Sequence, residues 1–415
     1  MTSRASRPVT HADDRNPVPV RRAYKFLLRP TAKQLAALEA CLEDHRQLYN
    51  AALEERREAW KTRAASVNYY HQATQLPEIR KADPVGQGRW SAGSQQQTLR
   101  RLDRAFGAFF RRVKAGEKAG YPRFRGRGWF DTVDWPAHKN GVRWNSVPHP
   151  TVTRVYLLGI GNVRVHQHRA VRGTVKMVSM KREGRRWYVI LACDDVPVQP
   201  LPATGATVGI DMGVVSFLTT SDSKHVPNPR PLAVAAARLT ATQQSLARKR
   251  RGSSRRRRAA ARVAALHAKV RRYRLDHAHK TALALVREHD VIVHEALKIG
   301  NMTLRPRPRP AADGTWEPNG ASAKAGLNKS ILDAGWGVFL GVLRAKAESA
   351  GRVIVEIDPR YTSQRCSQCG HVAAGNRVTQ AQFRCMVCGY ESHADVNAAR
   401  NILRAGLALQ AAGAA

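Results

Sequence analysis

The sequence has 415 residues and is 43% hydrophobic, which at about 150 residues per domain suggests two to four domains with room for a sizeable core. Lys and Arg number 70 against 31 Asp and Glu, so the formal charge is +39, and such self-repulsion favours a polyanionic partner. Eight Trp exclude a wholly disordered basic tail, and no apolar run approaches the roughly 20 residues of a membrane span. Nucleic acid is therefore favoured over a membrane surface.

The N-terminal region predicts strands mixed with helices. We expect residues 1–22 to form a disordered leader and residues 24–30 to form a strand. Thr31, with Gln34 three residues later, predicts a capping box that opens a helix. Two apolar stripes at helical spacing follow, one in each of two helices. Their members are Leu35, Leu38, Leu42, Tyr49 and Leu53, and then Leu99, Leu102, Phe106, Phe109 and Val113.

The middle of the chain predicts a small antiparallel sheet or barrel. Residues 152–193 form short alternating runs separated by turns that contain Gly. Before them, residues 121–131 interleave aromatic side chains with Arg123, Arg125 and Arg127, which we regard as candidates for nucleic-acid contact. The irregular residues 196–206 predict a linker.

The C-terminal half predicts alternating strands and helices. Strands are expected at residues 207–210, 214–220, 291–295 and 353–357. One amphipathic helix is expected through Leu332, Trp336, Phe339, Leu340 and Leu343, closed by Gly351. The Pro-rich residues 306–320 predict a surface insertion or linker.

A basic run covers residues 248–274, with thirteen Arg or Lys and no acid, and it ends in a predicted helix. A solvated charged helix is the common explanation of such runs. It is less suitable here, because a solvated face normally mixes both signs of charge. The run therefore predicts contact with nucleic acid, and Arg255, Arg256, Arg257 and Arg258 are its central candidates.

Four of the six cysteines form a metal-ligand pattern. Cys366-x-x-Cys369 is followed after fifteen residues by Cys385-x-x-Cys388, and Gly370 and Gly389 allow a tight turn after each pair. Four thiolates complete a tetrahedral zinc shell without an open position, so the pattern predicts a structural zinc ribbon. A redox pair and an iron cluster remain alternatives. We expect the isolated Cys41 and Cys193 to be core residues.

Three acids occupy positions typical of a divalent-metal site. Asp211 follows a buried strand, Glu295 ends another, and Asp395 lies at the start of a predicted helix. Strand ends are where an α/β sheet presents functional side chains, and gathered carboxylates suit hard divalent cations. Two such cations about 4 Å apart can activate water and stabilise the leaving oxygen in phosphodiester hydrolysis. Taken singly, each acid is more often a helix cap or a turn residue, because Asp is common at both positions.

Five motifs, in this order, closely resemble the transposon-encoded TnpB, or OrfB, proteins, which are RNA-guided DNA nucleases related to compact type V CRISPR effectors. The motifs are GIDMGVVSFLTTSD, HEALKIGNMT, LNKSILDAGWGVFL, DPRYTSQRCSQCG and HADVNAARNIL. The resemblance covers nearly all of residues 22–405.

The resemblance implies a multidomain α/β protein. Its N-terminal part would be a wedge β-barrel over residues 23–200, with a helical recognition insertion at about 31–125. Its C-terminal part would be a RuvC-like nuclease of the RNase H fold over 201–365 and 391–405. A zinc ribbon over 366–390 would interrupt the nuclease, and a tail would follow over 406–415. By motif position, the family's catalytic acids, which hold Mg²⁺ or Mn²⁺, fall on Asp211, Glu295 and Asp395. One structural Zn²⁺ would be held by Cys366, Cys369, Cys385 and Cys388.

The resemblance also implies partners and an activity. A noncoding RNA from the transposon end would serve as guide, and guide-matched double-stranded DNA beside a short adjacent motif would be the substrate. Base pairing would select the sequence, while the positive protein would hold the heteroduplex by neutralising phosphates. An RNA-guided repressor without cleavage is the alternative, but all three acids are present, which favours the enzyme. A third alternative is a DNA transposase in its own right. It has no support, because no residue beyond the three acids suggests a strand-transferring nucleophile.

The sequence predicts a cytoplasmic protein, and the resemblance implies that it is prokaryotic and nucleoid-associated. Its first twenty residues lack the apolar core of a secretory signal. Six Cys in 415 residues are too few for a disulfide scaffold, and four of them crowd into one stretch.

Overall fold

The computed structural model describes residues 20–136, 141–145, 153–312 and 314–414. They form two compact units, and the boundary lies between Pro197 and Val198. This boundary falls inside the segment that we expected to be a linker. The predicted leader lies outside the described residues up to residue 19, but residues 20–22 already belong to the first strand.

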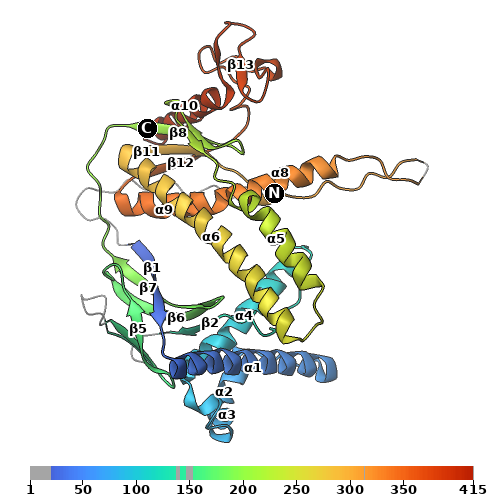
Figure 1. Ribbon diagram of the computed structural model, residues 1–415. Helices are drawn as coiled ribbons and strands as arrows, with labels where there is room; N and C mark the ends of the chain where they lie inside the picture. The colour runs from blue at the N-terminus through green and yellow to red at the C-terminus, as the bar shows by residue number, and fades with distance from the viewer. Residues whose placement is uncertain (1–19, 137–140, 146–152, 313, 415) are drawn as a thin grey trace. The chain divides into compact units, whose positions relative to one another are not determined.

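The N-terminal unit begins with a strand, continues with helices and ends with strands (Figure 1). The helices are α1 (Ala32–Arg63), α2 (Tyr69–Thr74), α3 (Leu76–Ala82), the 3-10 helix η1 (Gln87–Arg89) and α4 (Ala92–Lys114). The strands are β1 (Val20–Arg29), β2 (Thr132–Trp135), β3 (Val142–Asn145), β4 (Arg154–Leu157), β5 (Gly161–His166), β6 (Thr174–Glu183) and β7 (Arg186–Val196).

Helix α1 begins with the predicted capping box. The backbone N–H of Gln34 donates to Thr31 Oγ1 over 3.3 Å, and the N–H of Thr31 donates to Gln34 Oε1 over 3.1 Å. The apolar stripes of α1 and α4 are mostly buried, but Phe109 is only partly buried and the ends of the stripes are exposed. Leu35 is 37% exposed and Val113 is 52% exposed. Helical spacing does not show where the covering elements stop, so the ends of the two stripes reach beyond the core.

The predicted antiparallel sheet is confirmed. Its seven strands follow the order β2-β6-β7-β1-β5-β4-β3, and each recorded pair is antiparallel. Strand β1 therefore lies at the centre, and among the described residues β2 and β3 are its end strands. Cys193 on β7 and Cys41 on α1 are buried, as expected.

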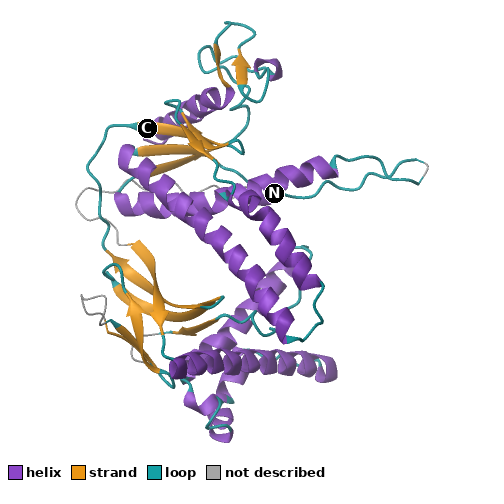
Figure 2. Ribbon diagram, in the orientation of Figure 1, coloured by secondary structure: helices purple, strands orange, loops and turns teal. Residues whose placement is uncertain are grey.

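The C-terminal unit is built around a five-stranded sheet (Figure 2). Its strands are β8 (Thr207–Met212), β9 (Ser216–Thr220), β10 (His225–Pro227), β11 (Val291–Glu295) and β12 (Val353–Ile357), in the order β10-β9-β8-β11-β12. Strands β8, β11 and β12 are parallel to one another, while β9 and β10 are antiparallel to their neighbours. The remaining elements are α5 (Pro231–Ala247), α6 (Ser254–Glu288), α7 (Ile299–Met302), α8 (Ala321–Ala334), α9 (Trp336–Ala350), η2 (Ala374–Asn376), β13 (Gln382–Arg384), β14 (Glu391–His393) and α10 (Ala394–Ala414).

Helices cover both faces of this sheet. Ile292 of β11 packs with residues of α6 and α9, whereas its neighbour Val293 packs with Ile402 of α10 on the other face. Successive strand residues point to opposite faces, so a central strand covered on both sides favours apolar side chains at successive positions. This explains the uninterrupted run at the start of β11.

The amphipathic helix predicted around Trp336 is interrupted. Gly335, with φ of 74°, separates α8 from α9. Leu332 is therefore 57% exposed, while Ile331 is buried in its place. Helix α9 ends at Gly351, as predicted.

The Pro-rich insertion forms an exposed antiparallel turn in which Pro310 is bridged to Trp316. Helix α10 continues to Ala414, through the residues expected to form a tail. Within the described ranges, no helix has both the length and the apolar composition needed to cross a membrane.

Candidate metal and nucleic-acid sites

Two of the three predicted acids lie side by side on parallel strands. His294 of β11 is in register with Ile210 of β8, so the next residues, Glu295 and Asp211, reach the same edge of the sheet. Both acids lie on the face of the sheet that α10 covers. Gly209 and Val293, each two residues earlier on the same strand, contact that helix, and residues two apart share a face. Strand β8 extends to Met212, so Asp211 lies inside the strand and not just beyond it as expected.

The third acid comes to this edge on α10. Asp395 lies in the first turn of that helix. The helix approaches β8 closely at Gly209, where a Cβ atom would lie only 2.2 Å from the carbonyl oxygen of Ala399. Ala399 is one helical turn after Asp395, so this contact brings the start of α10 towards Asp211. The structure thus brings Asp395 near enough to the other two acids for its charge, like that of Glu295, to act on Asp211.

Burial and nearby carboxylates shift the pKa of Asp211 most strongly. Burial raises the pKa of Asp211 to about 7, and the nearby carboxylates of Glu295 and Asp395 contribute to this rise. Burial also raises the pKa of Glu295. Carboxylates that repel one another in a partly buried site are stabilised by a cation, so this donor set of oxygen atoms fits Mg²⁺ or Mn²⁺.

A cation of the chain itself partly compensates the acids. Arg377, which lies between the two cysteine pairs, places Nη2 3.3 Å from Asp395 Oδ1 and donates to the carbonyl oxygen of Gln380 over 2.9 Å. It also lowers the pKa of Asp211, against the larger effect of burial. Nothing in the sequence around Arg377 indicated this role, because Arg is common throughout the chain.

An open cleft of about 1270 Å³ is lined by two of these acids, Asp211 and Glu295. Its lining includes Asp211, Glu295 and Arg377, together with further charged groups from several segments. The basic ones are Lys298, Arg344, Arg352 and Arg360, and the further acidic ones are Glu348, Glu356 and Asp358. Basic groups around a carboxylate cluster are suited to a phosphodiester backbone that reaches bound cations.

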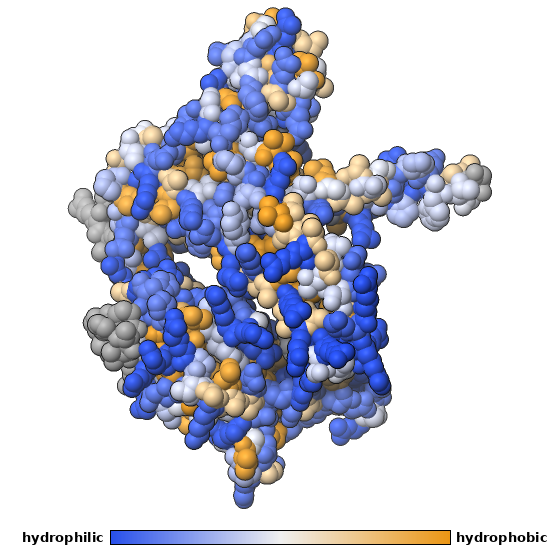
Figure 3. Space-filling model, viewed as in Figure 1, coloured by the Kyte–Doolittle hydropathy of each residue, from blue (hydrophilic) through white to orange (hydrophobic). Residues whose placement is uncertain are grey.

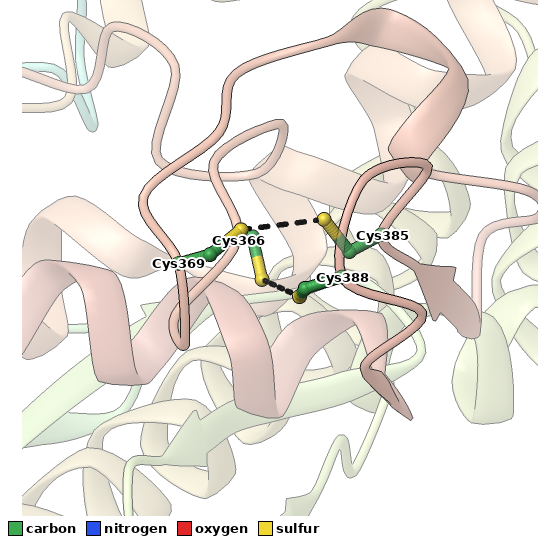
Figure 4. Close-up of side chains that lie close together, drawn as sticks. All are labelled: Cys366, Cys369, Cys385 and Cys388. Carbon is green, nitrogen blue, oxygen red and sulfur yellow. Dashed lines mark hydrogen bonds between the residues drawn. The ribbon is translucent and has the colours of Figure 1, made fainter.

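The four predicted zinc ligands are close together (Figure 4). Their sulfur atoms all lie within 4.8 Å of one another. Cys366 Sγ is 3.7 Å from Cys388 Sγ, and Cys369 Sγ is 3.5 Å from Cys385 Sγ. A tetrahedron with Zn–S bonds of about 2.3 Å has sulfur atoms about 3.8 Å apart, so the arrangement fits zinc.

The two turns of this cluster follow the predicted pattern. Gly370 and Gly389 have φ of 80° and 71°, and their N–H groups donate to the carbonyl oxygens of Cys366 and Cys385. Backbone N–H groups that point at the sulfur lower the pKa of Cys385 to about 6. A thiol that ionises readily is prepared for metal coordination.

The basic run of residues 248–274 connects α5 to α6 and continues along α6. Arg255, Arg257 and Arg258 are exposed in its first turns, and strongly hydrophilic side chains gather at this end of the helix pair (Figure 3). Arg256 differs, because its Nη1 donates to the carbonyl oxygens of Leu246 and Lys249 at the end of α5. Three of the four predicted arginines are therefore exposed and can contact nucleic acid, while Arg256 stabilises the turn between α5 and α6.

The three arginines predicted in the N-terminal unit lie on an exposed loop that is held by its backbone. Asn50 of α1 exchanges two hydrogen bonds with the backbone of Arg125, over 2.8 and 3.0 Å. Arg127 pairs with Glu43 over 3.4 Å, while Arg123 is exposed. The loop is thus fixed at its centre and presents basic side chains to solvent.

Comparison with known proteins gives three family matches. The models are described as "Probable transposase" (OrfB_IS605) for residues 176–305, "Cas12f1-like, TNB domain" for residues 336–402 and "Helix-turn-helix domain" (HTH_OrfB_IS605) for residues 20–64. Despite the last description, residues 20–64 form one strand and one long helix here.

Two relatives match along most of the chain. "Putative RNA-guided DNA endonuclease InsQ" of Escherichia coli (strain K12) is 33% identical over 94% of this chain and 94% of its own length. The second relative is "Putative RNA-guided DNA endonuclease" of Streptomyces pristinaespiralis. It is 34% identical over 95% of this chain and 91% of its own length. The chain therefore belongs to the TnpB (OrfB) family.

A solved structure is similar at a lower level. The chain in "Cryo-EM structure of CasPhi-2 (Cas12j) bound to crRNA" is 12% identical, with coverage of 94% of this chain and 99% of that chain and a TM-score of 0.47.

Proposed function

We propose that the protein is a transposon-encoded RNA-guided DNA endonuclease that hydrolyses guide-matched double-stranded DNA beside a short adjacent motif. The gathering of Asp211, Glu295 and Asp395 at one sheet edge is the observation that carries this proposal. The names of the two long relatives and the net charge of +39 support it independently.

The nuclease part is proposed to have the RuvC-like variant of the RNase H fold. The sheet order, numbered along this unit, is 3-2-1-4-5, with the acids on strands 1 and 4 and on the last helix. The domain limits proposed from the resemblance, including the ribbon over residues 366–390, are compatible with the cysteine cluster that precedes α10.

The three acids would hold divalent cations, which activate water and stabilise the leaving oxygen when bound. The chain's own groups then have separate tasks. Thr362 Oγ1 donates to Glu295 Oε1 over 2.5 Å and orients that carboxylate. Arg377 offers a planar guanidinium that can pair with a phosphate when the strand enters the cleft. The four thiolates would hold a zinc ion with a structural role.

Specific binding would depend mainly on base pairing between guide and target. A protein in this role needs a positive surface for the phosphates and a few contacts for the adjacent motif. The exposed Arg255, Arg257 and Arg258 of α6 fit the first task, and the basic loop of Arg123 and Arg125 is the candidate for the second.

The test is cleavage of a plasmid that carries a guide-matched target beside a randomised motif, with copurified RNA as guide. We expect cutting with Mg²⁺ and none after chelation. Asp211→Ala, Glu295→Ala and Asp395→Ala should each abolish cutting while target binding persists, and a double variant should be no worse than a single one. Cutting by the Asp211 variant would refute the assignment. Tight guided binding without cutting by the wild type would favour the repressor alternative.

A further inference from the structure

The loop that follows β12 connects the proposed divalent-metal site to the cysteine cluster. At one end, Thr362 is 7% exposed and its hydroxyl lies 2.5 Å from Glu295 Oε1. The same hydroxyl lies 3.0 Å from the carbonyl oxygen of Pro359. A hydroxyl has one proton to donate, and the shorter distance and the charge of the acceptor favour the carboxylate.

Two buried asparagines of α10 hold this loop. Asn401 Nδ2 donates to the carbonyl oxygens of Thr362 and Arg365, over 3.0 and 2.6 Å. Asn397 Nδ2 donates to Arg365 O over 2.8 Å, and Asn397 Oδ1 accepts from the N–H of Ser367 over 2.9 Å. The two asparagines are one helical turn apart, so they face the loop together.

The other end of the loop is a candidate zinc ligand. Cys366 lies between Arg365 and Ser367, the two residues whose backbone Asn397 binds. Its own N–H donates to the carbonyl oxygen of His371, within the first turn of the cluster. Five residues therefore carry both a thiolate of the cluster and the hydroxyl that contacts Glu295, and α10 holds this segment while also supplying Asp395.

We propose that Thr362 is a positioning residue for Glu295, and that the segment Thr362–Ser367, held by Asn397 and Asn401, makes divalent-cation binding at the acids depend on an intact cysteine cluster. The inference rests on the proposed function in one respect, the assignment of Glu295 to a divalent cation. The Thr362 hydroxyl fixes one rotamer of the carboxylate, so less freedom is lost when a cation binds.

The first test compares Thr362→Val with Thr362→Ser in the full chain, without nucleic acid. Valine keeps the shape and removes the donor, whereas serine keeps the donor. The readout is Mn²⁺ affinity by titration calorimetry, with Asp211→Ala defining the background. We expect valine to weaken Mn²⁺ binding by about tenfold, the order of one hydrogen bond to a charged group, and serine to restore it to within about twofold. Zinc content and melting temperature should stay near the wild-type values.

Unchanged Mn²⁺ affinity in the valine variant would overturn the positioning role. Equal losses with valine and serine would also overturn it, because they would indicate a packing effect and not a lost donor. This result is distinguishable from failure of the proposed function. Wild-type protein that binds Mn²⁺ in a Thr362-dependent way but cuts no guided target would refute the nuclease and leave the positioning role intact.

The second test addresses the connection to the cysteine cluster. Cys385→Ser should weaken Mn²⁺ binding about as much as Thr362→Val, and the two changes together should be less than additive, because both act on the same segment. Mild removal of zinc from wild-type protein by a chelator, followed by Mn²⁺ titration, gives the same measurement if the variant does not fold. Full Mn²⁺ affinity in folded, zinc-free protein would overturn the coupling.

Discussion

Gly209 of β8 and Ala399 of α10 are in direct backbone contact. A Cβ atom on Gly209 would lie 2.2 Å from the carbonyl oxygen of Ala399 and 2.7 Å from the backbone nitrogen of Leu403. Both neighbours are main-chain atoms, so no side-chain rotation could make room. The contact fixes how closely α10 approaches the strand that carries Asp211, and it thereby helps to set the position of Asp395.

Gly209→Ala is expected to push α10 away from the sheet. It should lower the free energy of unfolding by about 1–3 kcal/mol, as overpacking in a core typically does, and it should reduce guided cleavage although all three acids remain. Thermal unfolding and the plasmid assay measure both effects. Gly341→Ala on α9 is the matched control, because nothing lies within 4 Å of its added Cβ. Equal behaviour of the two variants would contradict this account of the contact.

The pKa of Asp211 predicts how stability depends on pH when no divalent cation is bound. Its ordinary value is 3.8 and its value in the fold is about 7, so between these limits the folded chain retains a proton that the unfolded chain has lost. The contribution of Asp211 to stability is therefore present at low pH and decreases as pH rises through about 4 to 7. The slope is at most about 1.4 kcal/mol per pH unit.

Asp211→Asn should remove this contribution. Urea unfolding in the presence of a chelator should show the variant gaining stability relative to the wild type as pH rises from about 4 to about 7. Saturating Mg²⁺ should reverse the order at neutral pH, because the cation stabilises only the wild-type carboxylate. Parallel pH profiles without cation would show that the carboxyl group is not shifted.

Arg377 is expected to matter for cleavage beyond its ion pair with Asp395. Arg377→Ala should slow cutting by about 100-fold at saturating Mg²⁺, the usual loss when a group that stabilises developing charge is removed. Arg377→Lys should be intermediate, since lysine keeps the charge without the planar fork. Single-turnover cleavage rates are the measurement. A rate for the alanine variant within about twofold of the wild type would leave Arg377 with a structural role only.

The cysteine cluster is expected to bind one zinc ion per chain. Cys385→Ser should lower the zinc content and the thermal stability of the C-terminal unit, since metal affinity and folding are coupled in such sites. Elemental analysis is the direct measurement, and Cys193→Ala, which removes a buried thiol outside the cluster, is the control that should keep its zinc. Protein that is purified without zinc, or unchanged zinc in the Cys385 variant, would contradict the assignment.

Features that depend on neighbouring residues in the sequence were predictable. The capping box of Thr31 and Gln34 was predicted, and so was the strand that ends at Glu295. The cluster of the four cysteines was also predicted, from their spacing alone. In each case one local segment contains both the signal and the structure.

Features that depend on distant segments were not predictable in the same way. Thr362 contacts Glu295 across 67 residues, and Gly209 meets Ala399 only because α10 crosses the sheet. Arg377 resembles any other arginine until the fold places it beside Asp395. Leu332 was placed on the apolar stripe of one predicted helix because its spacing matched, but the break at Gly335 leaves it 57% exposed. Local periodicity cannot indicate such contacts.

The basic turn between α5 and α6 allows a sharper test than neutralising all its charges. Arg255→Gln, Arg257→Gln and Arg258→Gln together remove three exposed charges and leave Arg256, which fastens the end of α5. If these groups neutralise phosphates, the slope of log affinity against log salt should decrease by about 2 to 3, since each contact contributes about 0.7 to 0.9. The fold should be unaffected. Arg256→Gln is the reverse control: it should lower the melting temperature and change the salt slope by one contact at most. Salt titrations of RNA binding and of guided DNA binding separate the two nucleic acids, and an unchanged slope in both would identify this stretch as a solvated helix face.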